Sequence, residues 1–299
     1  MPSVSPSLAE RMSSLASAVN DALDRVLPRS DFAESRLFDA MRYGALSGGK
    51  RLRPFLVMSS AALFGVNEEC ALRTAVAVEC VHCYSLIHDD LPAMDNSDLR
   101  RGKPTVHKQY DEATAILAGD GLLTLAFEIL ADTRTHEDPK VRCGLISALS
   151  KAAGASGMVG GQMLDLVAEN AELDIGAITR LQRMKTGELI AFSAEAGGIL
   201  GKASPAHLSA LRAYAHDLGL AFQIIDDLLD AEGSEEETGK SVGRDAKAGK
   251  ATFVTILGLE RARQQARLLS EQAIRHLGAF DGRAQNLEDI ARFVVDRNK

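Results

Sequence analysis

The chain has 299 residues, of which 46% are hydrophobic and 25% are charged, and its net charge is −7. This composition is typical of a globular protein with a packed core, and the negative charge argues against nucleic acid as the main partner. No run approaches 18 apolar residues without a charge, and no apolar stretch follows the N-terminus. We therefore predict neither a membrane span nor a secretory signal.

Helical periodicity dominates the whole chain, because apolar residues recur at spacings of three and four. The predicted helices lie near residues 8–27, 33–46, 54–64, 71–88, 110–131, 139–167, 177–200, 205–230 and 251–275. No alternating pattern predicts a strand. Polar, glycine-bearing segments separate some of these helices at 47–54, 95–104 and 231–250, and the last is long enough to indicate a function. We predict one all-α domain over residues 1–299.

Cys80 and Cys83 form a C-x-x-C pattern inside the predicted helix 71–88. A structural zinc site needs four ligands, and the sequence has no second C-x-x-C. A redox pair usually stands at a helix N-terminus, whereas this pair lies in the middle of a helix. The pattern therefore predicts two buried thiols and a reducing, cytoplasmic location.

Two acidic clusters each follow an apolar helical run. The first cluster, after AVAVECVHCYSLIH, contains Asp89, Asp90, Asp95 and Asp98. The second, in FQIIDDLLDAEG, contains Asp226, Asp227 and Asp230. Carboxylates near a helix C-terminus oppose the helix dipole, and like charges four residues apart repel, so both clusters are costly. One such cluster is explained as a solvated helix end, but two indicate a shared cation.

Clusters made only of carboxylates favour hard cations. Mg²⁺ typically takes one or two carboxylates, keeps several waters and is completed by substrate phosphates. Asp226 and Asp230 lie within about 40° of each other on an ideal helix, so they share one face. The sequence predicts two acidic helix ends that face each other across a cavity and hold Mg²⁺ and a diphosphate between them.

Basic side chains gather in glycine-containing segments. They are Lys50, Arg51 and Arg53 in GGKRLRP, Arg100, Arg101 and Lys103 in LRRGKP, Lys185 in MKTGE, and Lys240 and Lys250 in the segment 231–250. Each alone is most simply an ion-pair partner, but their grouping in an acidic chain favours phosphate binding. His82 lies about 20° from Asp89 on an ideal helix. A neutral core histidine and a diphosphate donor both fit that position.

Three other motifs fit less well. TGKS at 238–241 lacks the first glycine of a P-loop and follows three glutamates. Glu79-x-x-His82 occurs once, whereas a di-iron bundle needs two such pairs. His88-Asp89 and His216-Asp217 are typical of helical metal phosphohydrolases, but that interpretation leaves the second acidic cluster without a role.

Taken together, these motifs make the chain resemble the trans-prenyltransferases, or isoprenyl diphosphate synthases, over essentially its whole length. The family's DDxxxxD motif stands here as Asp89-Asp90-LPAM-Asp95, and its DDxxD motif as Asp226-Asp227-LL-Asp230. GGKRLRP, GGQMLDL, KTGEL and the TGK lysine stand in the family's order. YGALSGGKRLRPFLV and CYSLIHDDLPAMD are most similar to the bacterial farnesyl-type members. Asn96 and Ser97 depart from the pattern, because close relatives often have aspartates there.

The resemblance implies a large all-α bundle of long antiparallel helices around a deep central cavity, as a homodimer. It implies condensation of dimethylallyl or geranyl diphosphate with isopentenyl diphosphate, with three Mg²⁺ ions that Mn²⁺ is expected to replace. The implied metal ligands are Asp89, Asp95, Asp226 and Asp230, with Asp165 assisting. The implied allylic diphosphate ligands are Arg100, Lys185 and Lys240. The implied isopentenyl diphosphate ligands are Gly49, Lys50, Arg53, His82 and Arg101. Thr186 and Gln223 would line the reacting carbons.

The resemblance also implies that the residue five positions before the first aspartate, Tyr84, forms the floor of the cavity and stops the product near fifteen carbons. Tyr84 lies about 140° from Asp89 on an ideal helix and Ser85 lies nearer, so a floor shared with Ser85 is an open alternative. A geranylgeranyl diphosphate synthase is therefore the first alternative. A terpene cyclase would not need the isopentenyl pocket, and a non-catalytic partner subunit should have lost ligands of the acidic motifs.

Overall fold

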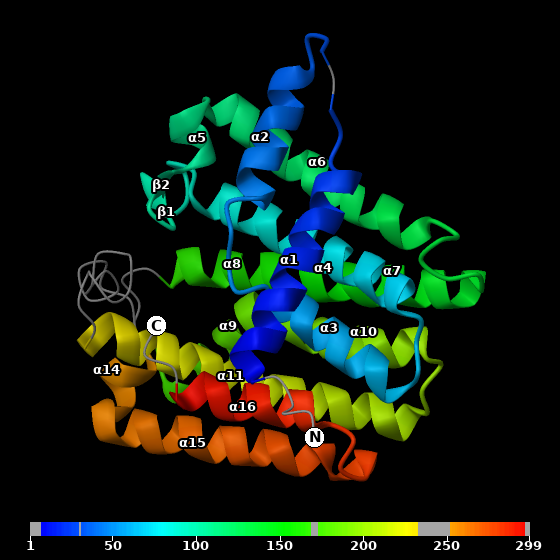
Figure 1. Ribbon diagram of the computed structural model, residues 1–299. Coiled ribbons are helices and arrows are strands. Elements are labelled where there is room, and N and C mark those ends of the chain that lie inside the picture. The colour runs from blue at the N-terminus through cyan, green and yellow to red at the C-terminus, as the bar shows by residue number, and fades with distance from the viewer. Residues whose placement is uncertain (1–6, 30, 169–172, 233–251, 297–299) are drawn as a thin grey trace. The chain divides into compact units, whose positions relative to one another are not determined.

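The computed structural model describes residues 7–29, 31–168, 173–232 and 252–296. These residues fall into two compact units. The first comprises the chain up to Met58 together with Asn67–Cys143, and the second comprises Ser59–Val66 together with the chain from Gly144 onward. One boundary lies within helix α3 (Leu52–Leu63) and another within helix α7 (Pro139–Ala153) (Figure 1). The predicted single domain over 1–299 stays a prediction.

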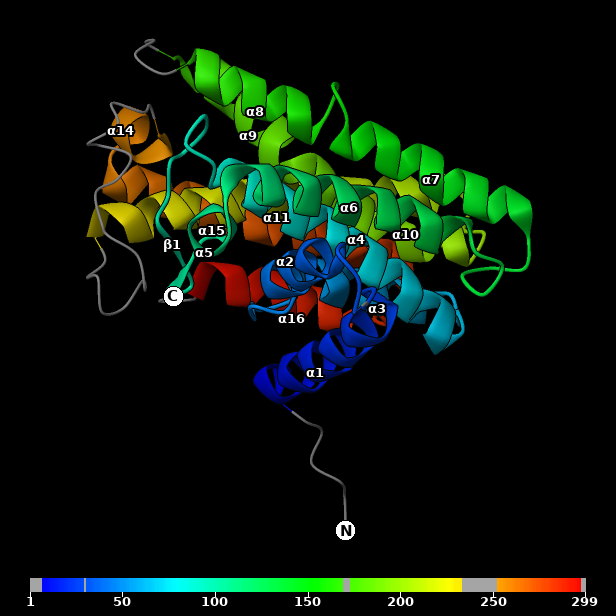
Figure 2. The ribbon, with the colours of Figure 1, turned by 90° about the horizontal axis from the view of Figure 1, so that it is seen from above.

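The first unit is built around helix α4 (Glu68–Asp89), which packs against α1, α2 and α6. Asn67 caps this helix, because its side chain accepts hydrogen bonds from the amides of Glu69 and Cys70. The remaining elements of the unit are α1 (Leu8–Val26), α2 (Ser35–Ala45), α5 (Val106–Gln109), α6 (Glu112–Ala131) and the strands β1 (Leu99–Arg100) and β2 (Lys103–Pro104). Helix α4 is apolar on most of its circumference, as expected for a helix surrounded by others. The view from above shows α4 lying along α6 (Figure 2).

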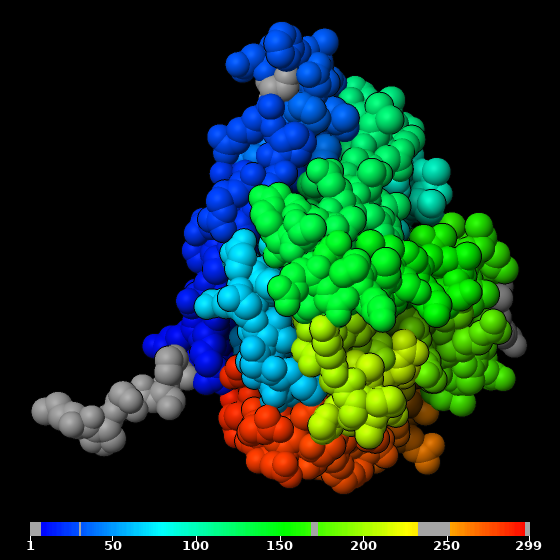
Figure 3. All heavy atoms as spheres, turned by 90° about the vertical axis from the view of Figure 1, so that its right-hand side faces the viewer, coloured from blue at the N-terminus to red at the C-terminus, as the bar shows by residue number. Residues whose placement is uncertain are grey.

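The second unit is built around helix α11 (Pro205–Glu232), which packs most extensively against α15 and α10. Its other elements are α8 (Met158–Val167), α9 (Ile175–Gln182), the π-helix η1 (Arg183–Gly187), α10 (Glu188–Leu200), α14 (Phe253–Leu257), α15 (Leu259–His276), the 3₁₀-helix η2 (Leu277–Phe280) and α16 (Gln285–Asp296). In the space-filling view the yellow-green α10–α11 region lies directly against the orange and red C-terminal helices (Figure 3).

The all-α prediction is confirmed, with differences at the breaks between helices. The predicted helix 139–167 is two helices, α7 and α8, because the segment Gly154–Gly157 interrupts it. The predicted helix 251–275 is interrupted at Gly258, whose φ of 78° ends α14. The predicted helix 177–200 contains the π-helix η1, and α16 was missed. The two-residue strands β1 and β2 were also missed.

Two helices of the first unit have the length and composition of membrane spans, although the sequence predicted none. They are α4 and α6. Within α4, 72% of the most apolar window is buried, which is the behaviour of a core helix. Because a core helix passes the same test of length and apolarity, the two helices are weak evidence for a membrane span.

Candidate active site

The turn after α4 brings the first and last carboxylates of the DDxxxxD motif together. The amide of Asp95 donates to the carbonyl of Asp89 over 2.9 Å, which folds the chain back onto the helix end. Asn96 closes this turn with φ of 47°. Asparagine tolerates the left-handed region better than most residues, which gives a physical reason for its presence here. Both Asp89 and Asp95 keep solvent-accessible surface.

Asp90 differs from its neighbour because it is buried and held inside the first unit. Arg100 grips it with two parallel hydrogen bonds of 2.7 Å, from Nε and from one terminal nitrogen. Such a fork fixes both side chains. Arg100 was predicted to bind the allylic diphosphate, and the structure shows that part of its hydrogen-bonding capacity is already engaged by Asp90.

A tight hairpin, missed by sequence reasoning, positions Arg101. Strands β1 and β2 pair antiparallel, and the two residues between them, Arg101 and Gly102, have φ of 54° and 74°. Positive φ at both positions is the signature of a type I′ turn. The sequence signal was the glycine at 102. Arg101 donates to the carbonyl of Gly48, and a Cβ on Gly49 would lie only 2.7 Å from its guanidinium carbon. The predicted pair Gly49 and Arg101 is therefore in contact.

The predicted pair Arg53 and His82 is also brought together. A terminal nitrogen of Arg53 lies 3.4 Å from Nε2 of His82. Burial lowers the pKa of His82 well below its ordinary value of 6.5, and the nearby guanidinium groups, first that of Arg53 and then that of Arg101, lower it further. His82 is therefore neutral at neutral pH in this structure. The positive charges of Arg53 and Arg101 make the place attractive to an anion.

Tyr84, the predicted floor residue, is buried in the first unit, and its ring packs edge-on against that of His88 at 5.7 Å. Burial, and then the charge of Asp89, raise its pKa to about 12, so the phenol keeps its proton. The His88 ring fills the space left by Gly119 on α6. Ser85 is partly buried, and its hydroxyl donates to the carbonyl of His82 over 2.9 Å.

The buried thiols predicted at Cys80 and Cys83 are confirmed. Both lie inside α4 without a disulfide. Burial raises the pKa of the Cys83 thiol to about 12, with a further contribution from Glu79. A protonated, buried thiol is inert toward redox chemistry and metal binding.

In the second unit, the π-helix η1 positions Lys185 and Thr186. Lys185 Nζ donates to Asp165 Oδ2 on α8 over 2.6 Å. This close packing of α8 on η1 depends on Gly161, because a Cβ there would collide with the backbone nitrogen of Lys185 and lie 2.5 Å from its Cα. A π-helical turn costs regular hydrogen bonding and is frequent at functional sites.

Thr186 and Gln223, predicted to line the reacting carbons, also meet within the second unit. The Thr186 hydroxyl donates to Gln223 Oε1 over 3.4 Å, and Gln223 Nε2 donates to Asp227 over 3.0 Å. Asp227 also accepts the amide of Phe253 at the start of α14 over 2.9 Å. Asp227 is therefore a buried structural acceptor.

Asp226 and Asp230 are only partly buried on the same helix as Asp227. Their spacing of four residues places them on one face of α11. Within the described part of the chain, no three histidine, cysteine or carboxylate side chains gather into a metal cluster. Pairs of carboxylates fit a hard cation that takes one or two protein ligands and is completed by phosphate oxygens.

Gln162 is a candidate that the sequence reasoning missed. It lies three residues before Asp165 on α8, and both polar atoms of its side-chain amide are buried without a hydrogen-bond partner among the described residues. Such an amide normally has a partner, so its isolation points to a ligand or a water. The available signal is the motif GGQMLDL, which contains both Gln162 and Asp165. Lys240 and Lys250 lie outside the described residues.

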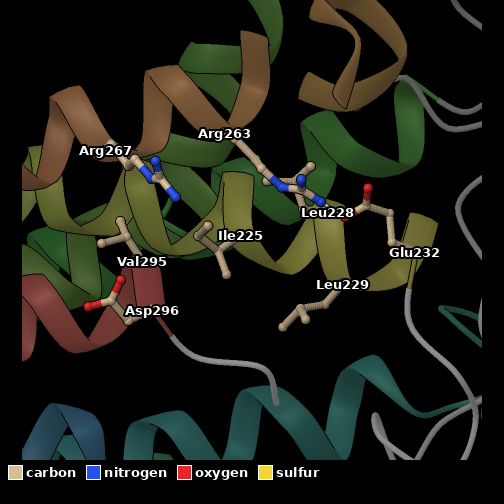
Figure 4. Close-up of a pocket in the computed structure, with 8 residues that line it drawn as sticks. All are labelled: Ile225, Leu228, Leu229, Glu232, Arg263, Arg267, Val295 and Asp296. Atoms are coloured by element: carbon tan, nitrogen blue, oxygen red, sulfur yellow. Dashed lines mark hydrogen bonds and ion pairs between the residues drawn. The ribbon is translucent and has the colours of Figure 1, made fainter. Parts of the chain in front are cut away.

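A separate pocket of about 340 Å³ lies between α11, α15 and α16 (Figure 4). Arg263 and Arg267 reach over it from α15, and the side chains that α11 contributes are mainly apolar. Arg263 forms an ion pair with Glu232 at the end of α11. None of the residues predicted for the active site lines this pocket.

Comparison with known proteins gives consistent results. A model of the polyprenyl synthetase family matches residues 34–287. The chain is 44% identical to the farnesyl diphosphate synthase of Escherichia coli, over 97% of this chain and 99% of that protein. An FPP/GFPP synthase from Zymomonas mobilis, in its apo structure, is 51% identical with a TM-score of 0.88, over 96% of this chain and 98% of that one. A geranyltransferase from Helicobacter pylori, complexed with magnesium and isoprenyl diphosphate, is 33% identical with a TM-score of 0.85, over 98% of each chain.

The close approach at Gly161 yields a test of packing. In the variant Gly161→Ala, the added methyl group meets backbone atoms that cannot move aside cheaply. We expect a loss of about 1–3 kcal/mol in the free energy of unfolding, measured with urea. Gly278→Ala is the matched control, because nothing lies within 4 Å of a Cβ at that position. Equal stability of the two variants would show that α8 and η1 are not tightly packed.

The lowered pKa of His82 predicts a pH dependence of stability. Below the ordinary pKa of 6.5 the unfolded chain binds a proton at this histidine, whereas the folded chain does not until the pH reaches the lower folded pKa. Stability from this group is therefore lost as the pH falls below 6.5, by about 1.4 kcal/mol for each unit of pKa difference. In urea titrations between pH 8 and pH 5, His82→Gln should lose less stability than the parent. Parallel curves would contradict the assignment.

Proposed function

The chain belongs to the polyprenyl synthetase family, and we propose that it is a trans-prenyltransferase that makes (2E,6E)-farnesyl diphosphate. It condenses dimethylallyl or geranyl diphosphate with isopentenyl diphosphate. The observation that carries this proposal is the set of contacts within each unit. Gly49 meets Arg101 and Arg53 meets His82 in the first, while Lys185 meets Asp165 and Thr186 meets Gln223 in the second. These pairs join residues that are far apart in sequence and were predicted to serve neighbouring parts of the same reaction.

The first unit offers a place for the diphosphate group of isopentenyl diphosphate, the non-allylic substrate. Lys50 and Arg53 lie on the segment that follows Gly49, Arg101 reaches this segment from the β1–β2 turn, and the neutral His82 contacts Arg53 from α4. A diphosphate there gains charge-assisted hydrogen bonds. Its alkene is thereby held in a fixed orientation, which converts the condensation into a reaction between prepositioned partners.

The allylic diphosphate has a different set of ligands. We propose Asp89, Asp95, Asp226 and Asp230 as ligands of three Mg²⁺ ions, with Asp165 assisting and Mn²⁺ as a substitute. When bound, these ions neutralise the negative charge that develops on the leaving diphosphate. Arg100, Lys185 and Lys240 bind the same group directly, although Lys240 lies outside the described residues. The role is supported by the accessible surface that Asp89, Asp95, Asp226 and Asp230 keep.

The reaction breaks the bond between the allylic carbon and the diphosphate oxygen, and the electron pair leaves with the diphosphate. The alkene of isopentenyl diphosphate then forms the new carbon–carbon bond, and a proton is lost to regenerate a double bond. Thr186 and Gln223 hold oxygen atoms close to one another, and such dipoles stabilise positive charge on carbon. No side chain of the described residues is an evident base, so the departing diphosphate takes the proton.

The alternatives differ in what they require. A geranylgeranyl diphosphate synthase needs more space beyond Tyr84, whose buried ring is packed against His88. A terpene cyclase has no use for the contacts around Gly49, and a non-catalytic subunit has no use for two complete acidic motifs. We further propose a homodimer in the cytoplasm. Exposed apolar side chains on α6 and on α8, and four free cysteines, support these two proposals.

Product analysis with and without metal tests the proposal. The purified protein is incubated with Mg²⁺, isopentenyl diphosphate and each allylic starter separately, and the products are resolved by mass. We expect a C15 diphosphate that disappears when EDTA removes the metal. A C20 product would preserve the reaction but refute the farnesyl assignment. Failure to condense any starter would refute the prenyltransferase proposal.

Tyr84→Ala tests the floor of the cavity. Removing the ring deletes a large buried side chain beside His88, so the growing hydrocarbon gains room and longer products should appear in the same assay. The matched control is Tyr214→Phe, which removes a hydroxyl that donates to the carbonyl of Leu287 in the second unit. An unchanged product length for Tyr84→Ala would remove this residue from the floor.

A further inference from the structure

Arg51 stands between two predicted ligands of isopentenyl diphosphate, yet it points into the protein. Lys50 is exposed and Arg53 is partly buried, whereas none of the Arg51 side chain is accessible. Its guanidinium donates to Glu79 over 2.5 Å and to the carbonyl of Ala45 over 2.8 Å. Two further hydrogen bonds, of 3.0 and 2.7 Å, reach the side-chain oxygen of Asn20. Arg51 is therefore unavailable to a phosphate.

The backbone around Arg51 is held in an unusual conformation. The φ angles of Gly48, Gly49 and Arg51 are 85°, 126° and 50°. Glycine adopts positive φ readily, but an arginine there costs about 1–2 kcal/mol. Such a conformation persists only where the surroundings fix it. Here the buried hydrogen bonds of the Arg51 side chain provide that fixation.

Global stability is a weak explanation for a buried ion pair. Removing two charges from water is expensive, and an apolar pair of similar volume is often equally stabilising. Glu79 is 2% exposed, so both partners bear this cost. A role in positioning accounts for the pair more directly.

The location of Glu79 indicates which segment the ion pair positions against α4. It lies on α4 three residues before His82, hence on a neighbouring part of the same helical face. Arg53, two residues after Arg51, contacts His82. The segment Gly48–Arg53 is thus attached to α4 at two adjacent points, and α4 ends at Asp89.

We propose that the buried Arg51–Glu79 ion pair is a positioning device, which fixes the segment Gly48–Arg53 on α4 so that Lys50 and Arg53 face isopentenyl diphosphate in a set geometry. The proposal rests on the proposed function. It assigns to Arg51 no contact with substrate, in contrast to its sequence neighbours. It also accounts for the cost of an arginine with positive φ in this segment.

The test replaces both charges by apolar side chains of similar length, in Arg51→Met/Glu79→Met. The control is Arg73→Met/Asp132→Met, because Arg73 lies on the same helix and pairs with Asp132 over 2.9 Å without touching the segment. We expect KM for isopentenyl diphosphate to rise about tenfold or more in the first variant only. KM for geranyl diphosphate should change by less than about threefold. Equal increases in both KM values, or no change in either, would overturn the proposal.

Two further measurements keep the test decisive. Arg51→Lys replaces the double variant if that variant does not fold. It keeps the charge but loses the planar guanidinium, so it should show the same selective rise in KM for isopentenyl diphosphate to a smaller extent. Hydrogen exchange of the amides of residues 48–53 needs no substrate, and it should accelerate in the Arg51 variants and not in the control. Unchanged exchange would refute the fixation. If the parent protein forms no product while exchange accelerates, the proposed function fails and the fixation stands.

Discussion

A charge removed from water must find opposite charge or hydrogen bonds, and this constraint separates the buried carboxylates of the two acidic motifs from those that keep accessible surface. In each acidic motif the first aspartate of the DD pair, Asp89 or Asp226, is partly accessible. The second, Asp90 or Asp227, is buried and accepts hydrogen bonds from protein donors. The pairs look equivalent in sequence, but burial gives their members different environments.

The same constraint separates the basic residues of the segment GGKRLRP by their burial. In GGKRLRP the middle arginine is neutralised by Glu79, while Lys50 and Arg53 remain near the surface of the first unit. In the sequence alone, Lys50, Arg51 and Arg53 formed one group of basic residues whose clustering favoured phosphate binding. The direction of a side chain in an irregular segment depends on φ angles, and glycines at 48 and 49 make those angles unpredictable from periodicity.

Much of the fold followed from the sequence because long amphipathic or apolar helices have a strong period. Helices α1, α2, α4, α6 and α11 lie close to their predicted ranges. The failures are local. The π-helix at Lys185 and the hairpin at Arg101 are short, and tertiary contacts to Gly161 and Gly49 stabilise them. The predicted site residues were recognised by motif, but their partners, such as Asp90 for Arg100, came only from packing.

Backbone distortion is concentrated where ligands were predicted. Among the non-glycine residues with positive φ in the described part of the chain, Arg51, Asn96 and Arg101 lie in the segments that carry the first unit's site. The other two, Lys202 and Asp281, follow helices at their C-terminal ends, where this conformation is a common stop signal. Each strained site residue is held by a buried or short-range contact. Because protein contacts already fix these segments, the proposed ligand would lose less binding energy to ordering them, and more of that energy would remain for the proposed reaction.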